Sequence, residues 1–234
     1  MKGFIRSKIK NQELRWARRN PRRYLKFLRK VGVKIGENIN FHGKVSTISI
    51  DITRPSLVTI GSNVSFNGYF NLITHDWGTF VIRNYYKDFI PSSGRVTIGN
   101  NVVFGRNVTV LKGVTIGDNC IIGTGSIVTK DIPGNSVAVG VPARVISTLE
   151  DYYNRRKKEC INEAFDYARS IKERFGRMPV LKDFWEEFPL FLNGDENVPD
   201  LPIRRQLGSA YEEYKKTHRA IFNGFEDFLK RAKL

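Results

Sequence analysis

A period of six residues runs through the middle of the chain. From Val96 onward, every sixth residue is large and apolar, and the residue two positions earlier is small or β-branched. These regularly spaced apolar residues are Ile98, Phe104, Val110, Ile116, Ile122 and Val128. Glycine follows them at Gly99, Gly105, Gly117 and Gly123. The same spacing continues upstream through Ile60, Phe66 and Leu72, and more weakly through Ile35 and Phe41.

Such a repeat indicates short strands separated by tight turns. Three or four extended residues bury alternate side chains, and a Gly, Asn or Asp then lets the chain turn. Three strands make a coil of about 18 residues, and stacked coils bury one continuous apolar column. The pattern therefore predicts a parallel β-helix over residues 35–148. Residues 76–95 have no six-residue phase, which predicts a loop inserted into the array.

Both flanks have helical patterns instead. Residues 1–34 mix aromatic and aliphatic residues with basic ones, and Pro21 after Asn20 indicates the start of a helix. Residues 149–234 carry apolar residues at helical spacing, with Gly176 as a stop signal and a last amphipathic helix expected over 207–232. The sequence thus predicts a basic helical leader, a β-helix domain and an α-helical C-terminal extension.

The net charge of +16 is concentrated at one end of the chain. Residues 1–34 hold 13 Lys and Arg against one acid, whereas residues 35–148 hold nine against six and residues 149–234 hold 17 against 16. A nucleic-acid-binding domain spreads its charge over the folded surface, so the near-neutral body argues against a nucleic-acid partner. A basic leader suits an anionic membrane surface instead.

The remaining composition excludes several other classes. No apolar run is long enough for a membrane span or a secretory signal, which predicts a cytoplasmic protein, with peripheral contact to the inner face of the membrane as a further option. Two cysteines and three histidines leave little material for a disulfide framework or a metal cage. Cys120 falls on an inward position, where a thiol packs as a small apolar group. We therefore expect neither a metal nor a cysteine nucleophile.

The chain resembles the hexapeptide-repeat acyltransferases, in particular their galactoside, maltose and xenobiotic acetyltransferase branch. The resemblance rests on residues 96–146, which read VTIGNNVVFGRNVTVLKGVTIGDNCIIGTGSIVTKDIPGNSVAVGVPARVI. It extends with gaps to Ile35 and covers about half of the chain. It implies a left-handed β-helix, an exception to the usual right-handed crossover, and a homotrimer with active sites between subunits. It also implies acetyl-CoA as the acyl donor.

Acyl transfer from a thioester requires a base for the proton of the attacking group, and imidazole is the side chain best suited to that task near neutral pH. In the family, a Thr-His pair carries the base, and this chain has Thr74-His75 at the matching place. The resemblance implies that His75 is the general base for direct attack by the acceptor. The group that orients His75 is left open between Asp76, a backbone carbonyl and another acid.

Candidates for substrate binding lie near His75 in the sequence. Asn67 and Asn71 carry amides, which recognise hydroxyl groups but serve equally well in turns. Asp76 and Trp77 open the inserted loop. The aromatic residues of this loop are suited to stack on a sugar ring, to cover a neighbouring subunit, or to pin the loop to the β-helix.

The resemblance also implies which residues bind coenzyme A. They are Arg106, Thr124, Thr129, Lys130 and Arg144. Cationic side chains suit the phosphates, and small residues let the pantetheine arm approach the backbone. Without the resemblance, Lys130 and Arg144 would be interpreted as solvated charges.

The function expected from the sequence is acetyl-CoA-dependent O-acetylation of a saccharide hydroxyl, on a sugar or a polysaccharide precursor. Two alternatives stay open. One is an N-acetyltransferase of an amino sugar or an antibiotic, and the other is a non-catalytic β-helical scaffold whose basic leader binds a membrane. The sequence does not specify the acceptor, the acyl chain length or the role of residues 149–234.

Overall fold

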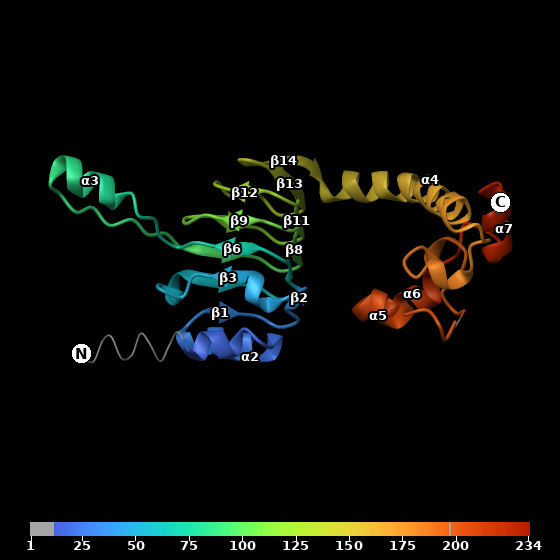
Figure 1. Cartoon of the computed structure of the whole chain (residues 1–234), viewed down its shortest axis with the longest axis horizontal. Coiled ribbons are helices and arrows are strands. Elements are labelled where there is room, and N and C mark those ends of the chain that lie inside the picture. Colours follow the sequence, from blue (N-terminus) through green and yellow to red (C-terminus); the bar gives the residue numbers. More distant parts are fainter. Residues whose placement is uncertain (1–11, 197) are drawn as a thin grey trace. The chain divides into compact units, whose positions relative to one another are not determined.

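The computed structural model describes residues 12–196 and 198–234, so the first part of the predicted leader, residues 1–11, lies outside the described residues. The chain divides into two compact units, with the boundary between Tyr152 and Tyr153 (Figure 1). The first unit is built from stacked sheets and the second from helices.

Three sheets form the sides of the first unit. The first contains β1 (Lys34–Ile35), β4 (Val58–Ile60), β7 (Val96–Ile98) and β10 (Thr115–Ile116). The second contains β2 (Asn40–His42), β5 (Ser65–Asn67), β8 (Val102–Phe104), β11 (Cys120–Ile122), β13 (Ser136–Gly140) and β14 (Ala143–Thr148). The third contains β3 (Ile48–Ile50), β6 (Phe70–Leu72), β9 (Thr109–Val110) and β12 (Ile127–Val128). Each coil contributes one strand to each sheet, so the unit is the predicted parallel β-helix.

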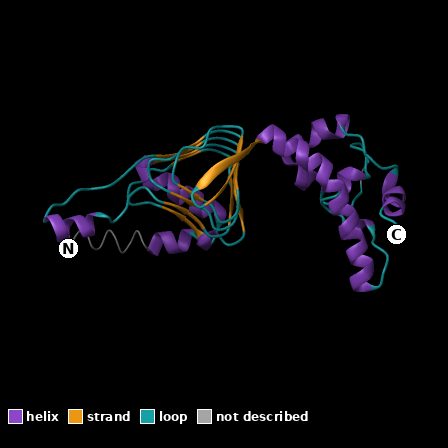
Figure 2. Ribbon diagram, turned by 90° about the horizontal axis from the view of Figure 1, so that it is seen from above, coloured by secondary structure: helices purple, strands orange, loops and turns teal. Residues whose placement is uncertain are grey.

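The strand register gives the length of each coil. Ile98 pairs with Ile116 on one side, 18 residues further along the chain, and with Ile60 on the other, 38 residues earlier. The additional 20 residues of the second separation are accounted for by the inserted segment 76–95. Successive coils therefore stay in register across the insertion, and they superimpose when viewed along the stack (Figure 2).

The apolar column lies inside the coils, as the six-residue period predicts. The six inward residues from Ile98 to Val128 are each at most 1% exposed. Phe66 and Phe104 stack with ring centroids 5.3 Å apart, and Phe41 lies on the other side of Phe66 at 5.8 Å. This stack arises because the three residues occupy equivalent positions on paired strands. Burying each such ring contributes about 1.5–3 kcal/mol.

Asparagine and glycine make the turns between the strands. Asn101, Asn119 and Asn135 occupy equivalent turns with φ of 54° to 58°, a left-handed conformation that Asn tolerates better than most residues. Their side-chain amides hydrogen-bond from coil to coil at 2.9 Å. Gly105 has a different role, because a Cβ there would lie 2.5 Å from the amide nitrogen of Thr124. The coils can stack this closely only where the side chain is absent.

Separate elements close the two ends of the stack. Helix α2 (Pro21–Val31) starts at Asn20, whose side chain accepts hydrogen bonds from the amides of Arg22 and Arg23, so the predicted helix start is confirmed. Its buried residues, Tyr24, Phe27 and Leu28, belong to the same apolar core as the coils. At the other end, β13 and β14 pair antiparallel, which ends the otherwise parallel array.

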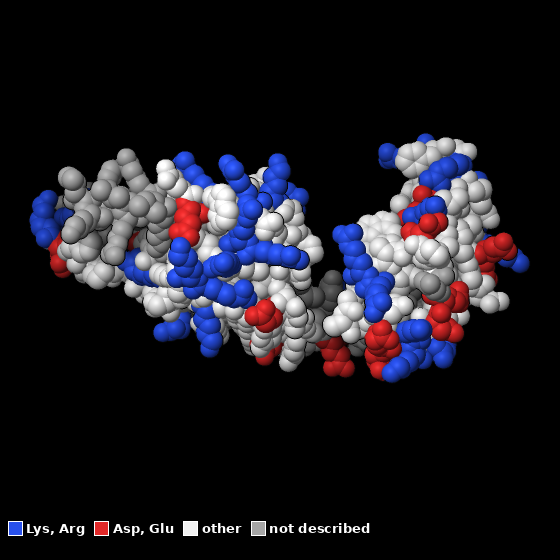
Figure 3. All heavy atoms as spheres, turned by 90° about the horizontal axis from the view of Figure 1, so that it is seen from below, with Lys and Arg blue, Asp and Glu red and all other residues white. Residues whose placement is uncertain are grey.

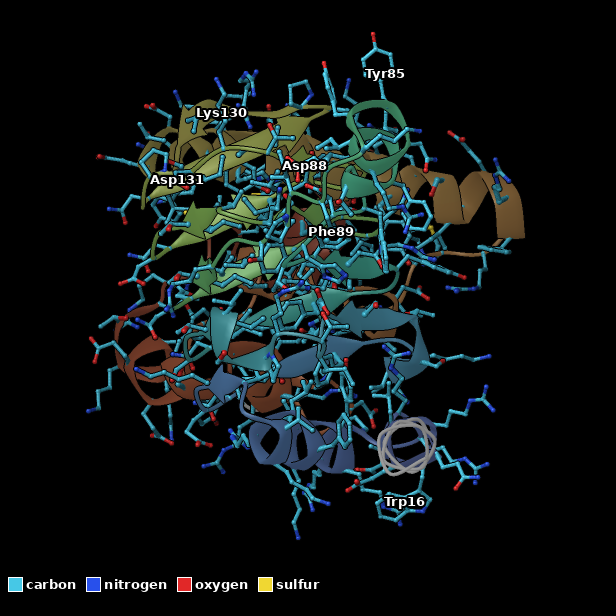
Figure 4. The ribbon with its side chains drawn as sticks, turned by 90° about the vertical axis from the view of Figure 1, so that its left-hand side faces the viewer. Trp16, Tyr85, Asp88, Phe89, Lys130 and Asp131 are labelled. Atoms are coloured by element: carbon cyan, nitrogen blue, oxygen red, sulfur yellow. The ribbon has the colours of Figure 1, made fainter. Side chains whose placement is uncertain are left out.

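The inserted segment contains a helix that the sequence analysis did not predict. Helix α3 (Thr79–Tyr86) occupies part of the segment between β6 and β7, and it extends away from the sheets (Figure 1). Figure 4 shows Tyr85 pointing outward from this segment. Large apolar side chains are exposed along it: Trp77, Phe80, Val81, Tyr85, Tyr86, Phe89 and Ile90. The expectation of a loop over 76–95 is therefore only partly right, since two helical turns are too short to give a clear period.

The second unit is α-helical, as predicted. It contains α4 (Leu149–Phe175, entering from the first unit), α5 (Ile203–Leu207), α6 (Tyr211–Thr217) and α7 (Gly224–Arg231), with short 3-10 turns η3 (Leu181–Asp183), η4 (Phe188–Leu190) and η5 (Gly208–Ala210). Its core is centred on Phe184, Phe191 and Phe228. The single helix expected over 207–232 is wrong, because residues 218–223 separate α6 from α7.

No helix within the described ranges is both long and apolar enough to cross a membrane.

The aromatic stack predicts a large effect of truncating one ring. We expect Phe104→Ala to lower the free energy of unfolding by about 3–5 kcal/mol, because it removes buried contacts and leaves a cavity between coils. Phe80→Ala, at a residue that is 48% exposed on α3, is the matched control. Denaturant unfolding at fixed protein concentration measures both. Equal losses in the two variants would contradict the proposed importance of the stack.

Candidate active site

Two adjacent coils bring His75 and Asp51 to the same corner of the β-helix. Asp51 follows β3 and His75 lies three residues beyond β6, and these strands pair with Ile50 opposite Leu72. The Asp51 amide donates to the carbonyl of Leu72 at 3.0 Å, which holds the two segments together. The returning arm of the inserted segment adds a bridge between His75 and Ser93. The backbone of His75 is thus fixed from both sides.

The carboxylate of Asp51 orients the imidazole of His75. Nδ1 of His75 lies 2.7 Å from Oδ2 of Asp51, and the two side chains are 18% and 10% exposed. An ionised carboxylate only accepts hydrogen bonds, so Nδ1 carries the proton in this contact. The other ring nitrogen, Nε2, then has a free lone pair. This is the tautomer that a general base requires.

Threonines on either side keep Asp51 ionised. Thr74 donates to Oδ2 through its amide at 3.1 Å and its hydroxyl at 2.5 Å, and Thr53 donates to Oδ1 through its amide at 2.8 Å and its hydroxyl at 2.7 Å. Burial alone would raise the pKa of Asp51, but the hydrogen bonds from Thr74 and Thr53 outweigh it and hold the pKa well below its usual range. A negative charge therefore faces His75 throughout the neutral range.

Asp76 does not contact His75. Its carboxylate forms an ion pair with Lys112 and accepts hydrogen bonds from the Ser92 hydroxyl at 2.8 Å and the Gly78 amide at 3.0 Å. The hydrogen bond from Lys112 is the largest of the effects that lower the pKa of Asp76 to about 2. The sequence left Asp76, a backbone carbonyl or another acid as the group that orients His75. In the structure, the group in contact with the imidazole is another acid, Asp51.

A cleft of about 520 Å³ opens beside His75. The Trp77 ring meets the imidazole edge-on at 6.0 Å between centroids and is 68% exposed, so it stands at the mouth of the cleft. The cleft combines an apolar wall with a few polar groups, which is the usual composition of a small-molecule site. It is lined by Ser49, Asp51, Leu72, Ile73, His75, Asp76, Trp77, Leu111 and Lys112.

The two asparagines proposed for substrate binding lie outside this lining. Asn67, on β5, donates from its side-chain amide to the carbonyl of Phe104 at 2.8 Å, so that amide is engaged in holding neighbouring coils together. Asn71, on β6, is half-buried and pairs with Ser49 and Thr109 in the third sheet. Of the four substrate-binding candidates, Asp76 and Trp77 line the cleft beside His75, whereas Asn67 and Asn71 do not.

The residues proposed for coenzyme A fall into separate groups. Thr129 and Lys130 follow Val128, the last residue of β12. Val128 pairs with Val110, which in turn pairs with Leu72, three residues before His75. Thr129 and Lys130 therefore lie at the same corner of the β-helix as His75, two coils further along the stack. Arg106 and Thr124 meet at a different turn, where the Arg106 amide donates to the Thr124 hydroxyl at 3.3 Å.

Two cationic candidates for the donor site have different surroundings. The guanidinium of Arg106 lies 5.7 Å from the centroid of the Tyr69 ring. Arg144, on β14, donates to the carbonyl of Ala143 at 2.9 Å. The two side chains therefore come from different turns of the coil rather than from one continuous patch.

Cys120 occupies the inward position expected for it. It is 1% exposed, its thiol lies 3.2 Å from the carbonyl of Pro133, and burial raises the pKa of the thiol. Such a thiol is a poor nucleophile. Within residues 12–196 and 198–234, no cluster of three or more His, Cys, Asp or Glu side chains could hold a metal ion.

The sequence analysis missed Asp51, Thr53 and Lys112. Asp51 follows Ile50, but η1 (Val45–Thr47) and η2 (Pro55–Leu57) interrupt the first coil and hide its six-residue phase. The available signal was Ile48-Ser49-Ile50, an apolar alternation typical of a strand, followed directly by an acid. Lys112 follows Val110 in the regular part of the repeat, so its position beside the His75 corner could have been inferred from the period.

Comparison with known proteins gives consistent matches. A sequence profile described as "Bacterial transferase hexapeptide (six repeats)" matches residues 95–130. Protein CapG of Staphylococcus aureus is 35% identical over 163 residues, which cover 68% of this chain and 88% of that protein. Galactoside O-acetyltransferase of Escherichia coli strain K12 is 46% identical over 121 residues, which cover 50% of this chain and 57% of that protein.

Among solved structures, a galactoside acetyltransferase in complex with coenzyme A is 34% identical, with a TM-score of 0.43 over 65% of this chain and 82% of that one. The stacked coils and the sequence matches together define an acyltransferase rather than a non-catalytic scaffold. The chain belongs to the bacterial hexapeptide-repeat transferase family, and its β-helix is left-handed, as the resemblance implied.

The hydrogen bonds to Asp51 predict an acid-sensitive contribution to stability. Its pKa in the folded protein lies below that of an unfolded aspartate, about 3.9. The ionised carboxylate therefore stabilises the fold above about pH 4, and this contribution is lost as the pH falls through the folded value. We expect Asp51→Asn to show a shallower loss of stability below about pH 4 than the wild type.

Denaturant unfolding over a series of pH values measures this difference. Asp88→Asn, at an exposed position in the inserted segment, is the control. Parallel pH profiles for Asp51→Asn and the wild type would show that Asp51 does not carry the effect.

Proposed function

We propose that this protein transfers an acetyl group from acetyl-CoA to a hydroxyl of a saccharide, with His75 as the general base. The observation that carries the proposal is the pair of His75 and Asp51 at the edge of a cleft, with Nδ1 bound to the carboxylate. The similarity to galactoside O-acetyltransferase over half of the chain supports the donor and the class of acceptor. The acetyltransferase names of other relatives support the acyl group.

The reaction follows from the orientation of the imidazole. Nε2 of His75 accepts the proton of the acceptor hydroxyl while its oxygen attacks the thioester carbonyl carbon. The tetrahedral intermediate then collapses, the carbon–sulfur bond breaks, and the coenzyme A thiolate leaves. The imidazolium returns its proton to the thiolate. Asp51 stabilises the imidazolium during these steps without taking up a proton, because its carboxylate is already held in the ionised form by Thr53 and Thr74.

The lining of the cleft suits a sugar. Trp77, Ile73 and Leu111 provide apolar surface for the face of a pyranose ring, and Ser49 and Lys112 provide hydrogen-bond donors for its hydroxyls. Asp76 offers acceptor oxygens on the same rim. Asn67 and Asn71 remain proposed acceptor contacts from outside the cleft, and for Asn67 this would require its amide to leave the Phe104 carbonyl.

For the donor, we propose that Thr129 and Lys130 bind coenzyme A at the corner above His75. Arg106 and Thr124 would then contact the arm or the nucleotide at the neighbouring turn, with Arg144 on the last strand as an additional cation. The separation of these residues over several turns fits a long donor molecule better than a compact one. Cationic side chains at its ends would neutralise the phosphates.

We further propose a homotrimer, a cytoplasmic location and peripheral contact of residues 1–34 with an anionic membrane surface. The exposed apolar residues of the inserted segment support assembly, because a patch of this kind rarely faces water in the functional state. The basic residues of α2 and the exposed Trp16 support the membrane contact, since Trp sits readily at a membrane interface. Acetyl-CoA is an intracellular donor, which supports the location.

Replacing His75 tests the proposed function. We expect His75→Ala to lower kcat by about 100- to 10,000-fold, because His75 is the proposed base and supplies the imidazole of the cleft lining. Release of coenzyme A thiol with a panel of mono- and oligosaccharides measures turnover, and calorimetry with acetyl-CoA confirms that donor binding persists. His42→Ala, at an exposed histidine on β2, is the control. Unchanged turnover in His75→Ala would remove His75 from the mechanism.

The chemical stability of the product separates O-acetylation from N-acetylation. An ester is cleaved by mild alkali or hydroxylamine, whereas an amide is not. Loss of the transferred acetyl group under these conditions is the expected result, and its persistence would favour the N-acetyltransferase alternative.

A second pair of variants tests which acid acts on the base. We expect Asp51→Asn to lower kcat by about 10- to 100-fold, because the amide no longer fixes the tautomer or stabilises the imidazolium. Asp76→Asn is expected to change KM for the acceptor more than kcat, since Asp76 faces Lys112 and not His75. Steady-state kinetics for both variants with the same acceptor measure the split. A larger effect of Asp76→Asn on kcat would reverse the two assignments.

A further inference from the structure

A second cleft lies at the N-terminal end of the first unit and shares no lining residue with the His75 cleft. Its volume is about 390 Å³. Half of its lining is cationic and none of it is acidic: the residues are Arg15, Arg18, Arg19, Pro21, Gly43, Lys44, Val45 and Ser46. Figure 3 shows Lys and Arg atoms gathered over this end of the unit, which α2 closes.

Both walls of this cationic cleft are anchored in the core. On one side, Ala17 is 1% exposed and fixes the end of a short helical segment that carries Arg15 and the turn after it that carries Arg18 and Arg19. On the other side, Val45 is 5% exposed and fixes the turn after β2 that carries Lys44. The cations are therefore presented by ordered backbone rather than by a free tail.

Among the residues that the structure describes, the cations of this cleft have no acidic partners. Elsewhere on this end of the unit, basic residues are paired: Lys30 with Glu13 at 2.6 Å, and Arg29 with Glu37 at 3.4 Å. Within the described residues, no carboxylate forms an ion pair with any of the four cations of the cleft, and residues 1–11 contain no acid at all. Like charges gathered without a counter-charge repel one another, so an anion in the cleft would be stabilised by all four.

Arg18 is one of the four cations and is held in place by the buried Tyr24. Its guanidinium lies 5.8 Å from the centroid of the buried Tyr24 ring, which holds the side chain in position. Its Nε is buried and has no hydrogen-bond partner within the described part of the chain. Guanidinium groups match the oxygens of a phosphate in a bidentate arrangement, and the Ser46 hydroxyl can donate to the same anion.

We propose that this cleft is a binding site for a phosphate or pyrophosphate group. The shape and charge suit a phosphate ester, and the volume leaves room for two linked phosphates. The group could belong to a lipid headgroup or to a soluble phosphorylated compound, and the chemistry recognised is the same in both cases. The site does not depend on the proposed acetyl transfer, because none of its residues lines the His75 cleft.

Binding of inorganic pyrophosphate, measured by calorimetry near physiological ionic strength, tests the proposal. We expect Arg19→Gln and Lys44→Gln each to weaken the affinity by about tenfold, because each removes a charge-assisted hydrogen bond. Lys26→Gln and Arg22→Gln are matched controls, since both residues are exposed on α2 and neither lines the cleft. The controls should bind within about twofold of the wild type. Thermal unfolding verifies that all four variants are folded.

Two outcomes would overturn the proposal. One is the absence of pyrophosphate binding to the wild type up to millimolar concentration. The other is an equal loss in the cleft variants and the controls, which would indicate diffuse attraction to a basic surface. Acetyl transfer to a small sugar should be unchanged in Lys44→Gln, so failure of the phosphate site and failure of the transferase assignment are distinguishable.

Sedimentation with vesicles then identifies the source of the phosphate. Phosphatidylcholine vesicles containing phosphatidic acid are compared with pure phosphatidylcholine vesicles. Binding that is lost in Arg19→Gln and Lys44→Gln, retained in Lys26→Gln and displaced by pyrophosphate would assign the cleft to a lipid headgroup. Equal sedimentation of cleft and control variants, together with selective loss of pyrophosphate binding, would assign it to a soluble phosphate compound.

Discussion

The parallel hydrogen bonding between successive coils is the interaction on which the rest of the first unit depends. Each coil pairs with the next in all three sheets, and this fixed register places equivalent residues directly above one another. The inward residues then form a continuous column, and the residues just beyond the strands form columns of their own along each corner. Asp51 and His75 meet because they occupy one such corner on consecutive coils. The geometry of the candidate active site is thus a direct product of the stacking period.

The sequence predicted the coils well and the contacts of the candidate active site less well. The period of six identified the buried positions of β7 to β12 because small, tightly packed turns tolerate few changes in spacing. The first coil was harder, since η1 and η2 lengthen its turns and shift the phase around Asp51. His75 could be proposed from its motif, but its partner comes from 24 residues earlier in the chain. The strand register is needed to show that residues 24 apart in the sequence lie on neighbouring coils.

For the helices, the length of the element decided whether the sequence could predict it. Helix α4 could be predicted through to Gly176 because its length gives several repeats of the helical period. Helix α3 and the break between α6 and α7 could not, because each involves only about two turns and depends on packing. The cationic cleft was also invisible in the sequence, where Arg15, Arg18 and Arg19 were part of a general excess of charge. The cleft becomes visible only in the structure, because its other wall is the turn at Lys44, which follows β2 in the chain.

The position of Asp51 within the stack has a consequence for how the enzyme loses activity. Terminal repeats of a solenoid have a neighbour on one face only and open more readily than internal ones. Asp51 lies on the first coil, whose outer face is covered by α2 through Tyr24 and Leu28. Fraying at this end would separate the acid from the imidazole while the later coils stayed folded. If Asp51 orients the base as proposed, the helix that covers the first coil also sets the temperature range over which catalysis persists.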